Sequence, residues 1–87
     1  MMVKDNQGLI RLRFRVVLAQ KETRDGKSYS YEAIKHETGI ATSTLTDWAK
    51  GRARFIAVDT LAALCKFLEC QPGDLLEYLP PESHVQP

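Results

Sequence analysis

The pattern of apolar and polar positions between residues 31 and 52 predicts two short helices joined at a glycine. In this segment, YEAIKHETGIATSTLTDWAKGR, Ile34 lies five residues before Gly39, and Leu45 and Trp48 lie three residues apart beyond it. A glycine at the joint allows a positive φ angle, so the chain can turn sharply. We therefore expect the second helix to cross the first at a steep angle, with its apolar side inward and its threonine and serine side outward.

The same periodicity along the rest of the chain predicts an all-α fold, a compact five-helix bundle in one domain of residues 9–80. The first expected elements are a helix over 9–22, a turn over 23–28 and a helix over 31–38 capped by Ser30. A helix over about 42–49, capped by Thr42 or Ser43, and a basic loop over 50–55 follow. The last two helices are one over 58–68 that buries Leu61, Leu64, Cys65 and Leu68, and one from Pro72 that buries Leu75, Leu76 and Leu79 and ends at Pro80. Residues 1–8 and 81–87 are expected to be flexible tails.

Residues 9–22 carry two overlapping patterns. Apolar residues alternate with arginines from Ile10 to Val16, as in a strand. The spacing of three and four from Phe14 to Lys21 fits one face of a helix instead. Because no partner strand is evident elsewhere in the sequence, we favour a helix. A strand that becomes a helix near Val16 is the alternative.

Composition limits the class of protein. The 87 residues, 44% hydrophobic and 26% charged, suit one small soluble globular domain. No apolar run approaches the ~20 residues that a membrane-spanning helix needs, and no secretory signal pattern appears. Cys65 and Cys70 lie five residues apart, which suits neither a disulfide nor a CxxC metal motif. We therefore expect reduced thiols and a cytoplasmic protein.

The two parts of the chain differ in charge. Residues 1–54 carry eleven Lys and Arg against six Asp and Glu, whereas residues 55–87 carry one against five. The basic part contains the glycine-hinged pair of helices. That coincidence favours a polyanion as the partner, and the pair has the sequence form of a helix-turn-helix, whose second helix enters the DNA major groove.

Polar side chains on the second helix of this pair are candidates for reading bases. They project from the side opposite Leu45 and Trp48, and they are Thr42, Ser43, Thr46 and Asp47. Hydroxyls can bond to base edges or phosphates, and a carboxylate can accept from the cytosine amino group. For the hydroxyls the alternative role is helix capping, and for Asp47 it is an ion pair with Arg52 or Arg54.

Cations after this helix are candidates for binding phosphates. Lys50, Arg52 and Arg54 lie within a stretch of five residues. On a turn beside the groove they would bind phosphates and set the register without reading sequence. Tyr31 opens the preceding helix, where its amide and phenol could reach a phosphate. Alternatively, Tyr29 and Tyr31 cover the end of the bundle.

The sequence offers no candidate catalytic or metal site. No nucleophile or acid–base pair has a reactive arrangement, and no glycine-rich phosphate loop appears. His36 and His84 stand alone, without a cysteine or carboxylate at ligand spacing. We expect no enzymatic activity, no cofactor and no metal, and we assign Trp48 to the core.

Two segments, TGIATSTLTDWAKGR and DTLAALCKFLECQPGDLLEYL, together resemble the Cro/repressor-type helix-turn-helix family, the small single-domain branch of the xenobiotic-response-element regulators of bacteria and phages. The similarity covers roughly residues 9–80. It implies five helices, a helix-turn-helix formed by the second and third, and dimeric regulation of transcription. By position it implies base reading by the four polar residues above, phosphate binding by Tyr31, Lys50 and Arg52, and packing by Ile34, Leu45 and Trp48.

The sequence departs from this family at two places. Lys35 stands where the family has alanine, close to the contact between the second and third helices. Its side chain must therefore extend outward to solvent, or the two helices must separate slightly. The turn TRDGKS is also longer than the family's connection, and could displace the first helix or offer a contact of its own.

We therefore expect a sequence-specific regulator of transcription, with repression favoured, that binds double-stranded DNA and is bacterial or phage-encoded. A homodimer is an open possibility, with the first segment and the leucine-rich last helix as candidate contacts. Neither a membrane nor a small-molecule ligand is expected. The alternative is a protein-interaction module, such as an antitoxin or adaptor, that uses the apolar C-terminal face. RNA binding is disfavoured because aromatic residues do not form a surface set.

Overall fold

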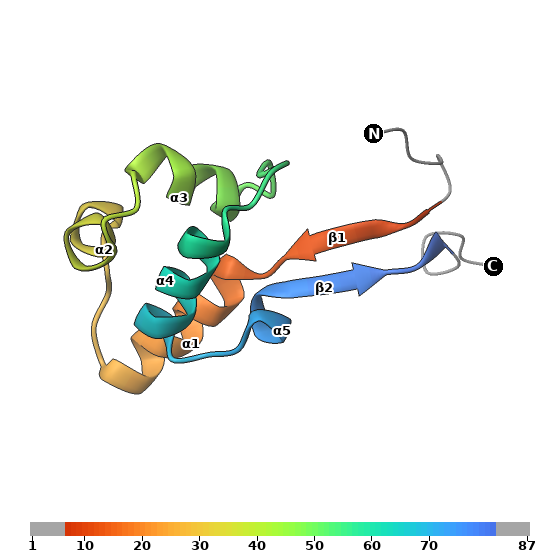
Figure 1. Ribbon diagram of the computed structural model, residues 1–87. Coiled ribbons are helices and arrows are strands. Elements are labelled where there is room, and N and C mark those ends of the chain that lie inside the picture. The colour runs from red at the N-terminus through yellow and green to blue at the C-terminus, as the bar shows by residue number, and fades with distance from the viewer. Residues whose placement is uncertain (1–6, 82–87) are drawn as a thin grey trace.

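Helices make up the body of the molecule, and two short strands form a ribbon beside it (Figure 1). The computed structural model describes residues 7–81, so most of both expected tails lies outside the described residues. The elements are β1 (Leu9–Leu12), α1 (Phe14–Asp25), α2 (Tyr31–Thr38), α3 (Thr42–Ala49), α4 (Val58–Leu68), α5 (Pro72–Leu75) and β2 (Leu76–Leu79). The predicted bounds of α2, α3 and α4 are confirmed.

The ribbon corrects the all-α prediction. β1 pairs antiparallel with β2, with Leu9 opposite Leu79 and Leu12 opposite Leu76. The helix favoured for residues 9–12 is therefore wrong, and the alternative of a strand followed by a helix is confirmed. The last helix likewise stops at Leu75 instead of continuing to Leu79. The two paired strands are separated by most of the chain. The periodicity within each segment therefore does not indicate that they pair.

Both strands connect directly to helices of the body. The Arg13 amide donates to the Leu75 carbonyl over 2.8 Å, where β1 meets α1 and α5 meets β2. Arg11 pairs with Glu77 across the two strands, and the Tyr78 hydroxyl donates to the Gln7 carbonyl over 2.8 Å. The ribbon thus joins the two ends of the described chain.

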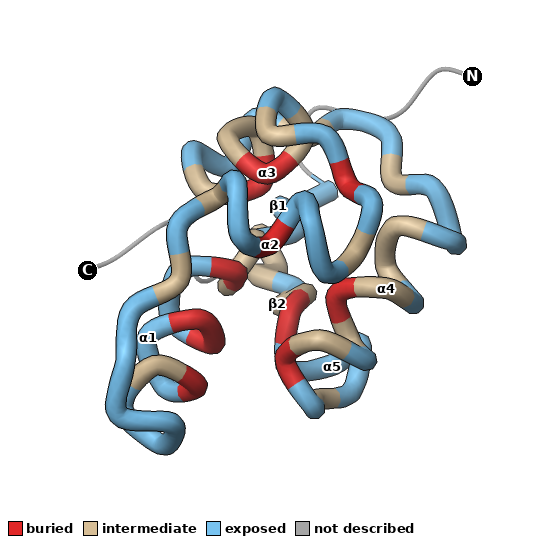
Figure 2. Tube along the Cα trace, turned by 90° about the vertical axis from the view of Figure 1, so that its left-hand side faces the viewer, coloured by how far each residue is buried: buried red, intermediate tan, exposed pale blue. Residues whose placement is uncertain are grey.

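The core lies where the helices face one another (Figure 2). Its buried apolar members come from all five helices and from Ile40 in the connection after α2. They are Phe14, Val17, Leu18, Ile34, Ile40, Leu45, Trp48, Leu64, Leu68 and Leu75. The predicted burial of Leu64, Leu68 and Leu75 is confirmed, whereas Leu61, Cys65, Leu76 and Leu79 are only partly buried.

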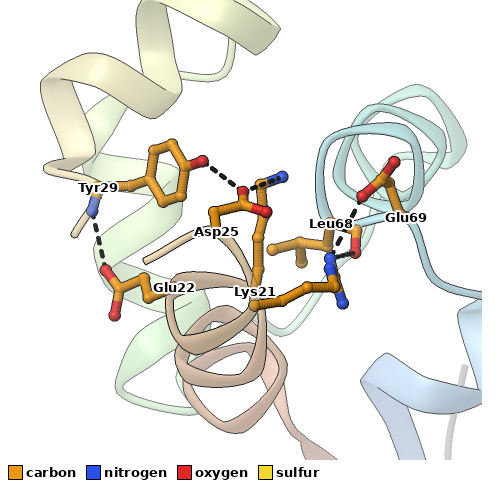
Figure 3. A network of polar contacts seen from close by, with 7 residues as sticks. Lys21, Glu22, Asp25, Tyr29, Leu68 and Glu69 are labelled. Atoms are coloured by element: carbon orange, nitrogen blue, oxygen red, sulfur yellow. Dashed lines mark hydrogen bonds and ion pairs between the residues drawn. The ribbon is translucent and has the colours of Figure 1, made fainter. Parts of the chain in front are cut away.

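Helix α1 ends in a polar network that fixes the start of α2 (Figure 3). The expected turn over 23–28 is wrong in its first three residues, because α1 continues to Asp25 and ends at Gly26 with φ 70°. The largely buried Lys21 ammonium pairs with Asp25 over 3.0 Å. Asp25 also accepts from the Tyr29 hydroxyl, and the Tyr29 amide donates to Glu22 over 2.9 Å.

Because of the hydrogen bond between Tyr29 and Asp25, the free energy of unfolding should vary with pH in the alkaline range. It raises the pKa of Tyr29 from 10.0 to about 12, because the neutral hydroxyl is the donor. A pKa that is raised in the folded state contributes stability below the unfolded-state pKa, and this contribution is lost as the pH rises through the folded-state pKa. We predict that Tyr29→Phe is less stable than wild type by a constant amount up to about pH 10. The difference should shrink toward pH 12. Denaturant unfolding across this range is the measurement, and a difference that does not vary with pH would show that the bond is not formed.

Candidate nucleic-acid interface

The connection between α2 and α3 is fixed by its backbone. Ser30 caps α2 as predicted, since its hydroxyl accepts from the Ala33 amide over 3.1 Å. Gly39 ends α2 with φ 79°, and its amide donates to the Lys35 carbonyl over 2.7 Å. A Cβ at Gly39 would meet no atom within 4 Å. Glycine is therefore favoured at this position by the backbone angle alone, since no neighbouring atom would clash.

Thr38 adds a second constraint that sequence reasoning did not identify. Its hydroxyl donates to the Ile34 carbonyl over 2.7 Å and accepts from the Ile40 amide over 3.1 Å. Ile40 itself is buried in the core. The chain is thus held on both sides of Gly39, and this sets the direction in which α3 leaves. A threonine directly before a helix-ending glycine was the available signal.

Helix α3 presents its polar side outward because its apolar side is anchored. Leu45 is 0% exposed and Trp48 is 2% exposed. The four predicted base-reading residues lie on the other sides of this helix, with Ser43 exposed and Thr42, Thr46 and Asp47 partly exposed. The prediction that Thr42 or Ser43 caps α3 is wrong, because the cap position is Ala41 and no side chain bonds there. Neither hydroxyl is therefore used as a cap.

Asp47 has a partner within the protein. Its carboxylate lies 3.4 Å from the Arg52 guanidinium, and the two side chains are 50% and 60% exposed. The Arg52 amide also donates to the Asp47 carbonyl over 2.7 Å. Of the two ion pairs considered for Asp47, the structure contains the one with Arg52 and not the one with Arg54. An ion pair this exposed is weak, so an approaching phosphate can compete for Arg52.

The three cations predicted to bind phosphates lie on the segment that follows α3. Lys50 ends the helix, Gly51 turns the chain with φ 69°, and Lys50, Arg52 and Arg54 are all exposed. The structure therefore brings these three predicted phosphate-binding residues together on one surface segment directly after α3. No Asp or Glu lies between Asp47 and Asp59, so the segment itself carries a net positive charge.

Tyr31 and Lys35 lie on α2. The Tyr31 ring packs at a tilt against Phe14, with ring centroids 6.2 Å apart, and so covers the end of the core. This matches the alternative role given to Tyr31, which is also the first residue of α2. Lys35 is exposed, so its side chain extends to solvent and does not intervene between the helices.

Sequence reasoning overlooked Phe55. This ring is 96% exposed at the end of the basic segment. The available signal was an aromatic residue placed directly after Arg54, in a stretch that was interpreted only for its charge.

Comparison with known proteins places this arrangement in a family. A model of the Cro/C1-type helix-turn-helix DNA-binding domain matches residues 14–81. The chain belongs to that family. It is 42% identical over 52 residues to an uncharacterised HTH-type transcriptional regulator of Bacillus subtilis, YozG, and the alignment covers 60% of this chain and 62% of that protein.

A solved structure supports the fold. The transcriptional regulator VanUg superposes with a TM-score of 0.63 and 22% sequence identity, covering 92% of this chain and 99% of that one. At this identity the likeness concerns the fold alone. Within residues 7–81, no helix is long and apolar enough to span a membrane. The same residues contain no group of three metal-binding side chains.

The angle at Gly39 gives a direct test of the connection. We predict that Gly39→Ala lowers the free energy of unfolding by about 1–2 kcal/mol, the cost of placing an L-residue in the left-handed region. Gly73→Ala is the matched control, because Gly73 has no positive φ and also has no atom within 4 Å of an added Cβ. It should leave stability unchanged or raise it. Equal effects of the two substitutions in chemical denaturation would contradict the role assigned to Gly39.

Proposed function

We propose that this protein is a sequence-specific regulator of transcription that binds double-stranded DNA. In this proposal α2 and α3 form the helix-turn-helix, and α3 enters the major groove. The observation that carries it is the position of α3 within the Cro/C1-type match, with Leu45 and Trp48 buried and its polar side turned outward. An α-helix fits the major groove, where each base pair presents a distinct pattern of donors and acceptors.

The proposal assigns different tasks to the two groups of residues. Thr42, Ser43, Thr46 and Asp47 read base edges from α3, and the cations after α3, together with Tyr31, hold phosphates. Lys50, Arg52 and Arg54 are exposed on the segment that α3 leads into. Phosphate contacts of this kind position a protein on the duplex and carry no sequence information. The family itself is one of DNA-binding domains, and catalysis forms no part of this proposal.

We further propose that the protein acts as a homodimer on a two-fold symmetric site. A lone domain of this size contacts few phosphates, and a second copy would double them. The ribbon offers a surface for this contact, because Ile10 and Tyr78 lie opposite each other on one of its faces and are both more than half exposed. A two-stranded ribbon is marginally stable alone in water, so covering it is favourable. The same apolar surface supports the alternative, a protein-interaction module.

Selection of binding sites from randomised duplexes tests the proposal. We predict enrichment of a defined motif, with affinity that falls steeply as salt rises because bound counterions are released. Replacing Lys50, Arg52 or Arg54 by Gln should weaken all duplexes alike and reduce the salt slope by roughly one each. A symmetric motif, with two chains per duplex by sedimentation, would establish the dimer. No enrichment, together with duplex retention that is unchanged when all three charges are reversed, would show that any retention does not use this surface. That outcome would contradict the proposed function and favour the protein-interaction module.

Asp47 should affect specificity more than affinity. We predict that Asp47→Ala changes the selected motif at one position, because the carboxylate no longer accepts from cytosine, with a discrimination loss of about 1–3 kcal/mol. The variant should also bind arbitrary duplexes more tightly, since Arg52 loses its partner and a carboxylate no longer repels phosphates. Asp59→Ala is the matched control, because it removes the same charge from the exposed start of α4. If Asp47→Ala and wild type select the same motif, Asp47 does not read a base.

A further inference from the structure

Phe55 is the most exposed of the large hydrophobic residues that the structure describes, at 96%. Its neighbours in the chain are held in place, because Ala53 and Ile56 are partly buried and pack against the core. Arg52, Arg54, Phe55 and Ala57, which lie between and beside these two anchors, are exposed. The segment is therefore anchored at two points and directs two guanidinium groups and one aromatic ring to solvent.

The charge of the segment determines which partner the ring suits. Residues 50–57, KGRARFIA, contain three cations and no anion. Contact between two copies through Phe55 would bring six cations together, and like charges in such a contact repel. A polyanionic partner would instead attract these cations. The basic segment also continues directly from α3, which the proposed function places in the major groove.

We propose that the Phe55 ring packs against the DNA duplex beside the groove that α3 enters, as an apolar contact with the sugars of the strand that Arg52 and Arg54 hold. This inference rests on the proposed function and adds a residue of a different chemical kind to the interface. The arginines neutralise phosphates, whereas the ring removes its own carbon surface and that of the sugars from water.

The two kinds of contact have different salt signatures. An arginine that binds a phosphate releases counterions, so its removal flattens the dependence of affinity on salt. A ring against a sugar releases none. Its removal lowers affinity at every salt concentration and leaves the slope unchanged. Because sugars carry no base identity, the selected motif also stays the same.

The experiment measures duplex affinity by fluorescence anisotropy at several salt concentrations, using the motif selected by the wild-type protein. We expect Phe55→Ala to weaken binding about tenfold at each concentration, because partial burial of an aromatic side chain contributes about this much. The salt slope and melting temperature should not change. Arg54→Gln should flatten the slope. Val58→Ala is the matched control, since Val58 is another apolar side chain, 79% exposed, just outside the basic segment. It should bind as wild type.

A second measurement reports contact directly. In Phe55→Trp the new indole should be accessible to the neutral quencher acrylamide in the free protein and shielded once the duplex is added. Trp48, which is 2% exposed, adds only a constant background in both states. Shielding together with the tenfold loss in Phe55→Ala supports the proposal.

The possible outcomes separate this inference from the proposed function. If the wild type binds duplex in a salt-dependent way and Phe55→Ala binds equally well, DNA binding stands and the role of Phe55 is refuted. If Phe55→Ala converts a dimer to a monomer in sedimentation without loss of affinity per chain, the ring contacts a second copy and the inference is refuted. If the wild type binds no duplex at any salt concentration, the proposed function and this inference both fail.

Discussion

Burial of Leu45 and Trp48 is the constraint on which the candidate interface depends. These two side chains fix the rotation of α3 about its own axis, so Thr42, Ser43, Thr46 and Asp47 remain on its other sides. The direction of α3 is set separately, by the positive φ of Gly39 and by the hydroxyl of Thr38. Rotation comes from packing and direction from the backbone, and a recognition helix needs both to meet base edges in a fixed register.

The helical part of the fold follows from local signals in the sequence. Ser30 and Gly39 bound α2, and the spacing of apolar residues identifies α3 and α4, because a cap or a helical face involves neighbours within a few residues. The ribbon was not predictable in this way. Leu9 and Leu79 lie at opposite ends of the described chain, and neither segment shows its partner locally. The polar and basic residues of the candidate interface could be identified from the sequence, as the helices could. Which arginine pairs with Asp47 could not, because that depends on the path of the chain after α3.

The candidate interface contains one weak internal ion pair beside two further exposed cations. Arg52 is held by Asp47 in the protein alone, and Arg54 and Lys50 are exposed next to it. An exposed pair contributes little to stability, so exchanging it for a phosphate costs little. Phe55 extends the same segment with an apolar group. The surface would then combine base reading by α3, phosphate contacts by the segment after it, and one apolar contact at its edge.

The most direct test of this account is the change in backbone amide shifts of the isotope-labelled protein when the selected duplex is added. The account predicts that the largest changes fall on residues 42–55, with smaller ones at the start of α2. The exposed face of α1, around Ala19 and Gln20, should be unaffected. Changes confined to the ribbon or to α1, with residues 42–55 unmoved, would contradict the central claim that α3 and the basic segment after it form the DNA-binding surface.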